Sequence, residues 1–202
     1  MANSSKQPKS AVVFVADGSE EMEAVVAIDI LRRAGVKVLV LAVEADAAKG
    51  CVVCSRGVKI VPDGHLGDES IKVSACDAVV VPGGVDGAAV LARNAQVLSV
   101  LADFHAQNKI VAAICAGTLA IKAAGIQAKV PQPLRVTSHP SVRDQLEHDF
   151  VYKEDRVVVD GHLVTSRGPG TAFEFGLRLV SLLAGDDKAR EVAAPMLVGF
   201  EV

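Results

Sequence analysis

The sequence predicts an α/β sandwich built around a mostly parallel central sheet. Short runs made almost wholly of apolar residues, such as residues 11–16 and 110–114, are typical of strands buried on both faces. Segments with helical signals alternate with these runs, as in successive βαβ units. The 202 residues suit one domain. We place it at residues 11–202, after a flexible polar N-terminal tail at residues 1–10.

The first βαβ unit is predicted between residues 11 and 43. Its first strand, residues 11–16, is followed by Ser19, which can cap a helix. Glu20 and Glu21 come next, in the first turn, where the helix dipole favours acids. We expect both of these carboxylates to face solvent. The helix runs to about residue 34, and a second strand follows it.

The later elements continue the alternation of strands and helices. They are a hairpin at residues 51–61, strands at 77–81 and 110–114, helices at 91–107 and 116–124, a short strand at 136–138, strands at 156–160 and 163–166, a helix at 171–183 and a further helix in the tail 186–202. Ligands of such sheets bind at the carboxyl ends of the strands. The candidate site positions are therefore residues 17–19, 82–84, 115–117 and 138–140.

Cys115 lies in one of these positions, between a buried strand and a helix. The pattern Ala113-x-Cys115-x-Gly117 places small residues two positions before and after the cysteine. This spacing is typical of a strained nucleophile elbow, where the chain approaches itself closely. The N–H groups and dipole of the helix would then lower the thiol pKa below its usual ~8.5. The alternative is a small buried core residue.

Three other features supply candidate partners for Cys115. Backbone N–H groups of Gly83 and Gly84 could form an oxyanion hole with that of Ala116, although a plain glycine turn is the alternative. Glu23 lies among apolar residues of the first helix, where a carboxylate is costly unless it is paired or protonated; otherwise it faces solvent. His139, at a strand end, is either a base or a structural histidine.

Composition excludes several classes of function. A net charge of -3 and the lack of a basic stripe argue against nucleic-acid binding, and no apolar run reaches the ~18 residues of a membrane span. Cys51-x-x-Cys54 falls in a predicted strand, so its thiols point to opposite faces and do not form a redox pair. We expect no metal and no cofactor. The cysteine pattern favours the cytoplasm, with nuclear or mitochondrial pools as alternatives.

Several long motifs occur in an order that resembles a known family. They are "GSEEMEAVVAIDILRRAGVKV", "CSRGV", "VVVPGG", "AAICAGTLA", "TSHP" and "TSRGPGTAFEF". Together they resemble the ThiJ/PfpI superfamily, whose domain is also described as class I glutamine-amidotransferase-like, and within it the Parkinson-disease protein deglycase branch. The resemblance runs from about residue 11 to residue 198. It implies a flavodoxin-like three-layer sandwich and a homodimer.

The resemblance also implies roles for individual residues. Cys115 corresponds to the reactive cysteine, and Glu23 to a protonated glutamate that hydrogen-bonds the sulfur. Gly84 and Ala116 correspond to backbone donors, and His139 to the site histidine.

Other positions match features at the edge of the family's site. Arg33 and Arg56 match arginines that line a small anion site at the dimer interface, and the 194–197 segment resembles a C-terminal helix that partly covers the site. Ala116 stands where protease relatives carry histidine, which argues against peptidase activity. Val61 stands in place of a second, peripheral cysteine, so regulation through that thiol does not carry over.

The implied function is a cysteine-dependent glyoxalase or protein deglycase that needs no cofactor. Its substrates would be methylglyoxal, glyoxal and early glycation adducts of proteins or nucleotides, with a role in oxidative stress. The alternative is a redox sensor and stress chaperone that works through oxidation of Cys115 to the sulfinate. A non-catalytic protein with the fold alone is a third reading, disfavoured because Glu23, Gly84, Cys115 and His139 occur together.

Overall fold

The computed structural model describes residues 8–200 and contains a central sheet flanked by two helical layers. The sheet has seven strands in the order β10-β11-β7-β6-β1-β2-β5, all parallel except β10, which runs antiparallel to β11. These strands are β1 (Ser10–Val15), β2 (Lys37–Ala42), β5 (Gly64–His65), β6 (Ala78–Val81), β7 (Ile110–Ile114), β10 (Val157–Asp160) and β11 (Leu163–Ser166). The predicted α/β class with a mostly parallel sheet is confirmed.

Six α-helices and two small strand pairs complete the described chain. The helices are α1 (Glu21–Arg33), α2 (Val85–Arg93), α3 (Ala95–Ala106), α4 (Thr118–Ala123), α5 (Ala172–Ala184) and α6 (Asp186–Ala193). The small strands are β3 (Val52–Val53) with β4 (Lys59–Ile60), and β8 (Arg135–Val136) with β9 (Val151–Tyr152). Short 3-10 helices lie at Ala47–Lys49, Val73–Ala75, Cys115–Gly117, Gln127–Lys129, Pro140–Gln145, Pro169–Thr171 and Ala194–Met196.

The two faces of the sheet carry separate hydrophobic cores. Alternate residues of β1 point to opposite faces, so Val13 enters the core beneath α1, α5 and α6, whereas Phe14 enters the core beneath α2, α3 and α4. Both side chains are fully buried. Because both faces are buried, the sequences of these strands are continuous apolar runs and do not alternate between apolar and polar residues.

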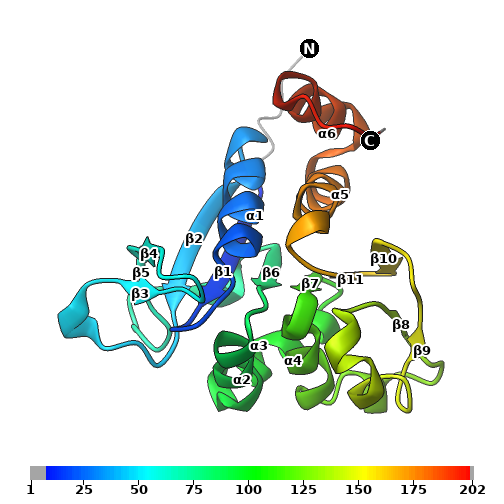
Figure 1. Ribbon diagram of the computed structural model, residues 1–202, viewed down its shortest axis with the longest axis horizontal. Coiled ribbons are helices and arrows are strands. Elements are labelled where there is room, and N and C mark those ends of the chain that lie inside the picture. Colours follow the sequence, from blue (N-terminus) through cyan, green and yellow to red (C-terminus); the bar gives the residue numbers. More distant parts are fainter. Residues whose placement is uncertain (1–7, 201–202) are drawn as a thin grey trace.

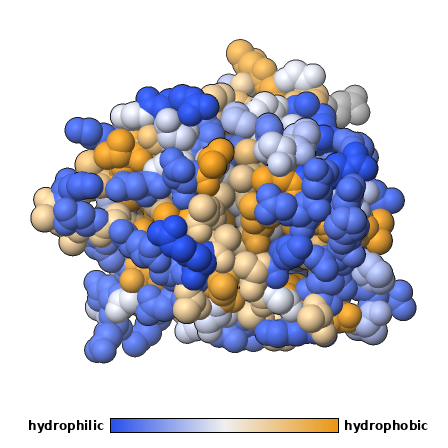
Figure 2. Space-filling model, turned by 60° about the horizontal axis from the view of Figure 1, so that its bottom comes forward, coloured by the Kyte–Doolittle hydropathy of each residue, from blue (hydrophilic) through white to orange (hydrophobic). Residues whose placement is uncertain are grey.

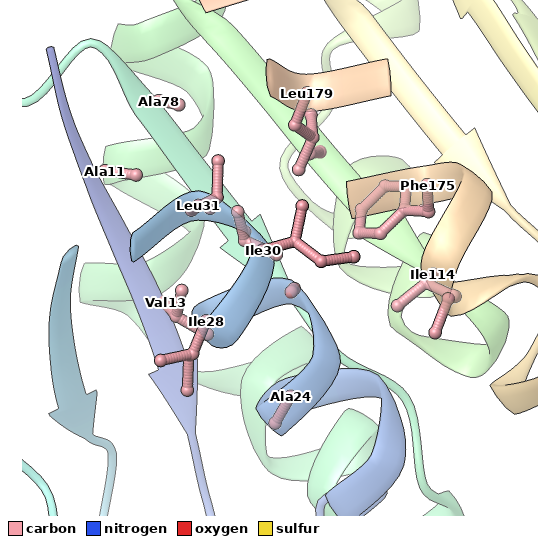
Figure 3. Packing of buried hydrophobic residues seen from close by; sticks show 14 of the residues in the cluster. Ala11, Val13, Ala24, Ile28, Ile30, Leu31, Ala78, Ile114, Phe175 and Leu179 are labelled. Carbon is pink, nitrogen blue, oxygen red and sulfur yellow. The ribbon is translucent and has the colours of Figure 1, made fainter. Parts of the chain in front are cut away.

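Helices α1 and α5 pack directly against each other on the first face. Ile30 of α1 points toward Phe175 of α5 in Figure 3, and both are fully buried. A Cβ on Gly176 would lie 2.8 Å from Cδ1 of Ile30. The glycine therefore allows the two helices to approach closely, and this contact holds α1, with Glu23 on its first turn, against the sheet.

The segment 91–107, predicted to be largely helical, is helical at residues 91–93 and 95–106. The structure has two helices there, and Asn94 separates them by accepting hydrogen bonds from the N–H groups of Gln96 and Val97, each at 3.0 Å. The first of the two helices starts earlier than predicted, at Val85. Gly87 in its first turn is required by packing rather than by a loop, because a Cβ there would lie 2.4 Å from the Ser19 nitrogen.

The ends of the described chain depart slightly from the prediction. Ser10, assigned to the tail, is the first residue of β1, and Lys9 beside it forms an ion pair of 2.8 Å with Asp77. The rest of the predicted tail, residues 1–7, lies outside the described residues. A helix was predicted in the C-terminal tail, and α6 occupies its first part.

The surface of the molecule carries both hydrophilic and apolar side chains. Figure 2 brings forward the side that is lowest in Figure 1, and a band of apolar and neutral residues crosses it between hydrophilic side chains. Within residues 8–200, no helix has the length and hydropathy needed to cross a bilayer.

Candidate active site

Cys115 occupies the predicted elbow at the end of β7. Its φ is +62°, in the left-handed region that residues other than glycine rarely adopt, so the backbone is strained at this residue. A Cβ on Gly117 would lie 2.6 Å from the carbonyl oxygens of both Val81 and Pro82. Only glycine fits here, as the elbow pattern predicted. The chain turns at Cys115–Gly117 as a 3-10 helix before α4 begins.

Glu23 lies beside Cys115, and Gly83 packs against both side chains. Its side chain is fully buried, and its Oε2 accepts a 2.7 Å hydrogen bond from the N–H of Gly83. A Cβ on Gly83 would lie 2.6 Å from Cβ of Cys115, 2.7 Å from Oε2 of Glu23 and 3.0 Å from Sγ of Cys115. The thiol and the carboxyl therefore lie side by side beneath this glycine.

The N–H of Gly83 is consequently not available to a substrate oxyanion, which corrects its predicted role. The peptide N–H groups of Gly84 and Ala116 face the sulfur and stabilise its charged form. Gly84 has a φ of +85°, and a Cβ on it would lie 2.2 Å from the Gly18 oxygen. Its glycine thus allows the strand end of β6 to approach the start of α1.

Two carboxylates beside Glu23 differ from expectation. Glu20, rather than Ser19, caps α1, because its Oε2 accepts a 2.8 Å hydrogen bond from the N–H of Glu23. Glu21 was expected to face solvent but is only 6% exposed. It accepts hydrogen bonds from the Ser55 hydroxyl at 2.7 Å and the Arg56 N–H at 2.8 Å, and so fixes the turn after β3.

The thiol and the buried carboxyl form a coupled acid pair. Burial raises the pKa of Glu23 to about 7, and the charge of Glu20 acts in the same direction. Burial, and after it the charge of Glu23, raise the pKa of the Cys115 thiol to about 12, against the effect of the N–H groups of Ala116 and Gly84. The expectation of a thiol pKa lowered by the helix start is therefore wrong. Glu23 is the group placed to take the thiol proton.

His139 lies at the same pocket, at the end of the segment that follows β8. Its Nδ1 is 2.8 Å from the Ser141 hydroxyl and accepts from the Ser141 N–H at 3.2 Å. This arrangement places the proton of the neutral ring on Nε2, which has no hydrogen-bond partner among residues 8–200. The pocket measures about 310 Å³, and its lining includes Glu20, Arg56, Val85, Cys115, Ala116 and His139.

The two arginines of the predicted anion site are not brought together within one chain. Arg56 lines the pocket near the start of α1, whereas Arg33 ends that helix and pairs with Asp29 at 2.5 Å. A helix of this length separates its two ends by about 18 Å. An anion site that uses both arginines would need a second chain, and it stays a prediction.

Cys51 and Cys54 lie just outside the strand in which they were predicted, which covers only the two valines between them. They flank β3 of the small antiparallel pair, and both are free thiols.

The fold and the elbow define an α/β protein with a cysteine in a strained turn at the carboxyl end of its sheet, beside the switch point between β1 and β6. The chain belongs to the DJ-1/PfpI family, whose model matches residues 9–182.

Individual relatives align over nearly the whole chain. The chain is 42% identical to the Parkinson disease protein 7 homolog of Danio rerio over 193 residues, covering 94% of this chain and 97% of that protein. It is 35% identical to a Caenorhabditis elegans protein named glutathione-independent glyoxalase DJR-1.2, covering 93% and 96%. The crystal structure of Drosophila melanogaster DJ-1beta superposes with a TM-score of 0.86 at 41% identity, covering 96% of this chain and all of that one.

Proposed function

We propose that the protein is a glutathione-independent glyoxalase that converts methylglyoxal to lactate and glyoxal to glycolate. The observation that carries this proposal is the contact between a strained cysteine and a buried carboxyl that titrates near neutral pH. The name of the Caenorhabditis elegans relative supports the same class of activity.

The chemistry begins with addition of Sγ of Cys115 to the aldehyde carbon of methylglyoxal. The thiol proton passes to Glu23, which delivers it to the former carbonyl oxygen, and the product is a hemithioacetal. The proton on the sulfur-bearing carbon then moves to the neighbouring carbon by way of an enediol. The hydroxyl proton on the sulfur-bearing carbon passes to the oxygen of that neighbouring carbon, which gives a lactoyl thioester. His139, which lines the same pocket, and Glu23 are the groups that carry these protons.

Water completes the reaction by hydrolysing the thioester, which releases lactate and restores the thiol. One methylglyoxal and one water give one lactate, so the reaction needs no external oxidant or reductant. The N–H groups of Gly84 and Ala116 stabilise the sulfur when it carries charge.

A lactate assay on wild type and Cys115→Ser tests the proposal. We expect the variant to lose at least ~100-fold in kcat/KM, as for loss of a nucleophile. Cys51→Ser, at a partly exposed free cysteine outside the site, is the matched control and should keep full activity. Full turnover by Cys115→Ser would rule out the mechanism.

We propose in addition that the enzyme removes early glycation adducts from proteins or nucleotides. The same hemithioacetal forms if the aldehyde first leaves its adduct, so activity on adducts can be indirect. Mixing the enzyme with a glycated peptide beside a fast chemical aldehyde trap separates the two cases. Repair faster than the trapped spontaneous release supports true deglycase activity, and equal rates refute it.

A redox-sensing role is the second candidate, favoured by one feature of Glu23. Its Oε1 is buried and has no hydrogen-bond partner within residues 8–200. When protonated, this carboxyl can donate to an oxygen on Cys115 after peroxide oxidises the sulfur through the sulfenic to the sulfinic acid, each peroxide being reduced to water. Intact mass after mild peroxide should show the sulfinic acid in wild type and over-oxidation or none in Glu23→Leu. Equal oxidation of both proteins would exclude this role for Glu23.

A further inference from the structure

The backbone around His139, which follows β8, is hydrogen-bonded by a tyrosine of β9. Tyr152, the last residue of β9, donates from its hydroxyl to the carbonyl oxygen of Ser138 at 3.1 Å. The Ser138 hydroxyl lies 3.1 Å from the tyrosine oxygen and donates to the carbonyl oxygen of His139 at 3.0 Å. Ser138 is fully buried. The carbonyl oxygens on both sides of the His139 Cα therefore accept hydrogen bonds from these two hydroxyls, and that of His139 also accepts one from the N–H of Val142 at 3.1 Å.

The ring of Tyr152 is itself held from the segment that follows His139. The guanidinium of Arg143 lies 5.2 Å from the ring centroid, within the range of a cation–π contact. Arg143 also binds Glu147 at 2.7 Å and Glu154 at 2.8 Å. Tyr152 thus contacts the chain before His139 through its hydroxyl and after His139 through its ring.

Within residues 8–200, the polar contacts of the Tyr152 hydroxyl are all with Ser138. Among the described residues, it donates to the carbonyl of Ser138, and the hydroxyl of Ser138 is the other polar group within hydrogen-bond distance. Strand pairing of β9 with β8 and the contact with Arg143 do not need it. Replacing the hydroxyl alone therefore removes one of the hydrogen bonds that fix the backbone at His139 and leaves the packing of the ring in place.

We propose that Ser138 and Tyr152 form a positioning pair for His139 and set the place of its imidazole at the pocket that holds Cys115. The kinetic consequence rests on the proposed glyoxalase function, whereas the structural consequence does not. Neither residue reaches the pocket lining, so both act through His139.

Nuclear magnetic resonance of the histidine ring carbons tests the structural part without any substrate. The chain has five histidines, and the His139 signal is identified by its loss in His139→Gln. Tyr152→Phe should shift or broaden the His139 signal and leave the other four in place. An unchanged His139 signal in Tyr152→Phe would overturn the proposal, whatever the enzyme's activity.

Kinetics test the consequence for the reaction. Tyr152→Phe and Ser138→Ala should each lower kcat for methylglyoxal by about tenfold with little change in KM, because small displacements of a reacting group are costly. The double variant should be little worse than either single one, because the two hydroxyls lie against each other and hold the same short stretch of backbone. Val151→Ala, at an exposed neighbour on β9, controls for loss of strand stability and should keep full kcat.

The outcomes separate the two proposals. If the His139 signal shifts but wild type makes no lactate through Cys115, the pair positions His139 and the glyoxalase function fails. If Tyr152→Phe and Val151→Ala lose kcat equally, or the single losses simply add, the hydroxyl has no positioning role.

Discussion

At the scale of residues, Cys115 and Glu23 act as one acid pair rather than as two independent groups. Because burial raises the pKa of both groups and the negative charge of Glu23 raises the thiol pKa further, the pair releases its two protons in separate steps and holds a single proton between them. That state has both a proton acceptor and a nucleophile in contact. The sequence placed Glu23 on an apolar face, which pointed to this pairing. It could not show the depth of burial, which reverses the expected direction of the thiol pKa.

The buried carboxyl of Glu23 should make stability depend on pH. Its pKa rises from 4.5 to about 7 on folding, so the folded state binds more protons between these values. Stability is then fully present below pH 4.5 and falls as pH rises to about 7, by about 3 kcal/mol in all. Glu23→Gln removes this loss. Urea unfolding at pH 4.5 and pH 8 should show a smaller decrease in the variant than in wild type.

Glu69→Gln, at an exposed residue, is the control for that experiment and should follow wild type. Comparing the pH-induced change between variants cancels the contributions of all other titrating groups. Parallel stability curves for wild type and Glu23→Gln would contradict the assigned burial of the carboxyl.

At the scale of elements, the site depends on glycines at contacts between elements that are distant in sequence. The spacing around Cys115 identified Gly117 in advance, because an elbow needs a small residue there. The role of Gly83 was misjudged, since the glycine turn alone does not show that its N–H is bound by a carboxylate. Short elements were also the hardest to predict: Asn94 ends one helix and begins the next with no loop between them.

Gly117→Ala should destabilise the fold, because its Cβ would contact two backbone oxygens at 2.6 Å. Overpacking of this kind costs about 2 kcal/mol. Gly170→Ala, whose Cβ would meet no heavy atom within 4 Å, is the matched control and should be nearly neutral. Chemical denaturation of both variants measures the difference. Equal midpoints would show that the elbow is looser than described.

At the scale of the whole molecule, the order of strands explains why the site residues meet. The chain runs from β1 to β2 on one side and then crosses to β6 and β7 on the other. Glu23 follows β1, Gly84 follows β6 and Cys115 follows β7, so the switch point gathers them at one edge. Alternating strands and helices predicted this edge correctly. The placement of Tyr152 behind His139 comes from β8 and β9, two-residue strands that leave no periodic pattern in the sequence.

We propose that two chains form a homodimer through the exposed face of α1. Met22 and Val25 on this helix are 53% and 44% exposed, so two apolar side chains three residues apart face solvent on it. Analytical ultracentrifugation should show a dimer for wild type. Met22→Lys combined with Val25→Lys should give monomers, whereas the same change at Val61, also exposed, should not. A monomeric wild type would refute the proposal.

The contact between Tyr152 and Ser138 also gives the molecule a built-in optical reporter. The chain contains one tyrosine and no tryptophan, so its near-ultraviolet absorbance and intrinsic fluorescence come chiefly from the ring of Tyr152. The emission of that ring responds to the hydrogen bond of its hydroxyl. Any event that moves the backbone at His139 can therefore be followed by light from a single known residue, without a label.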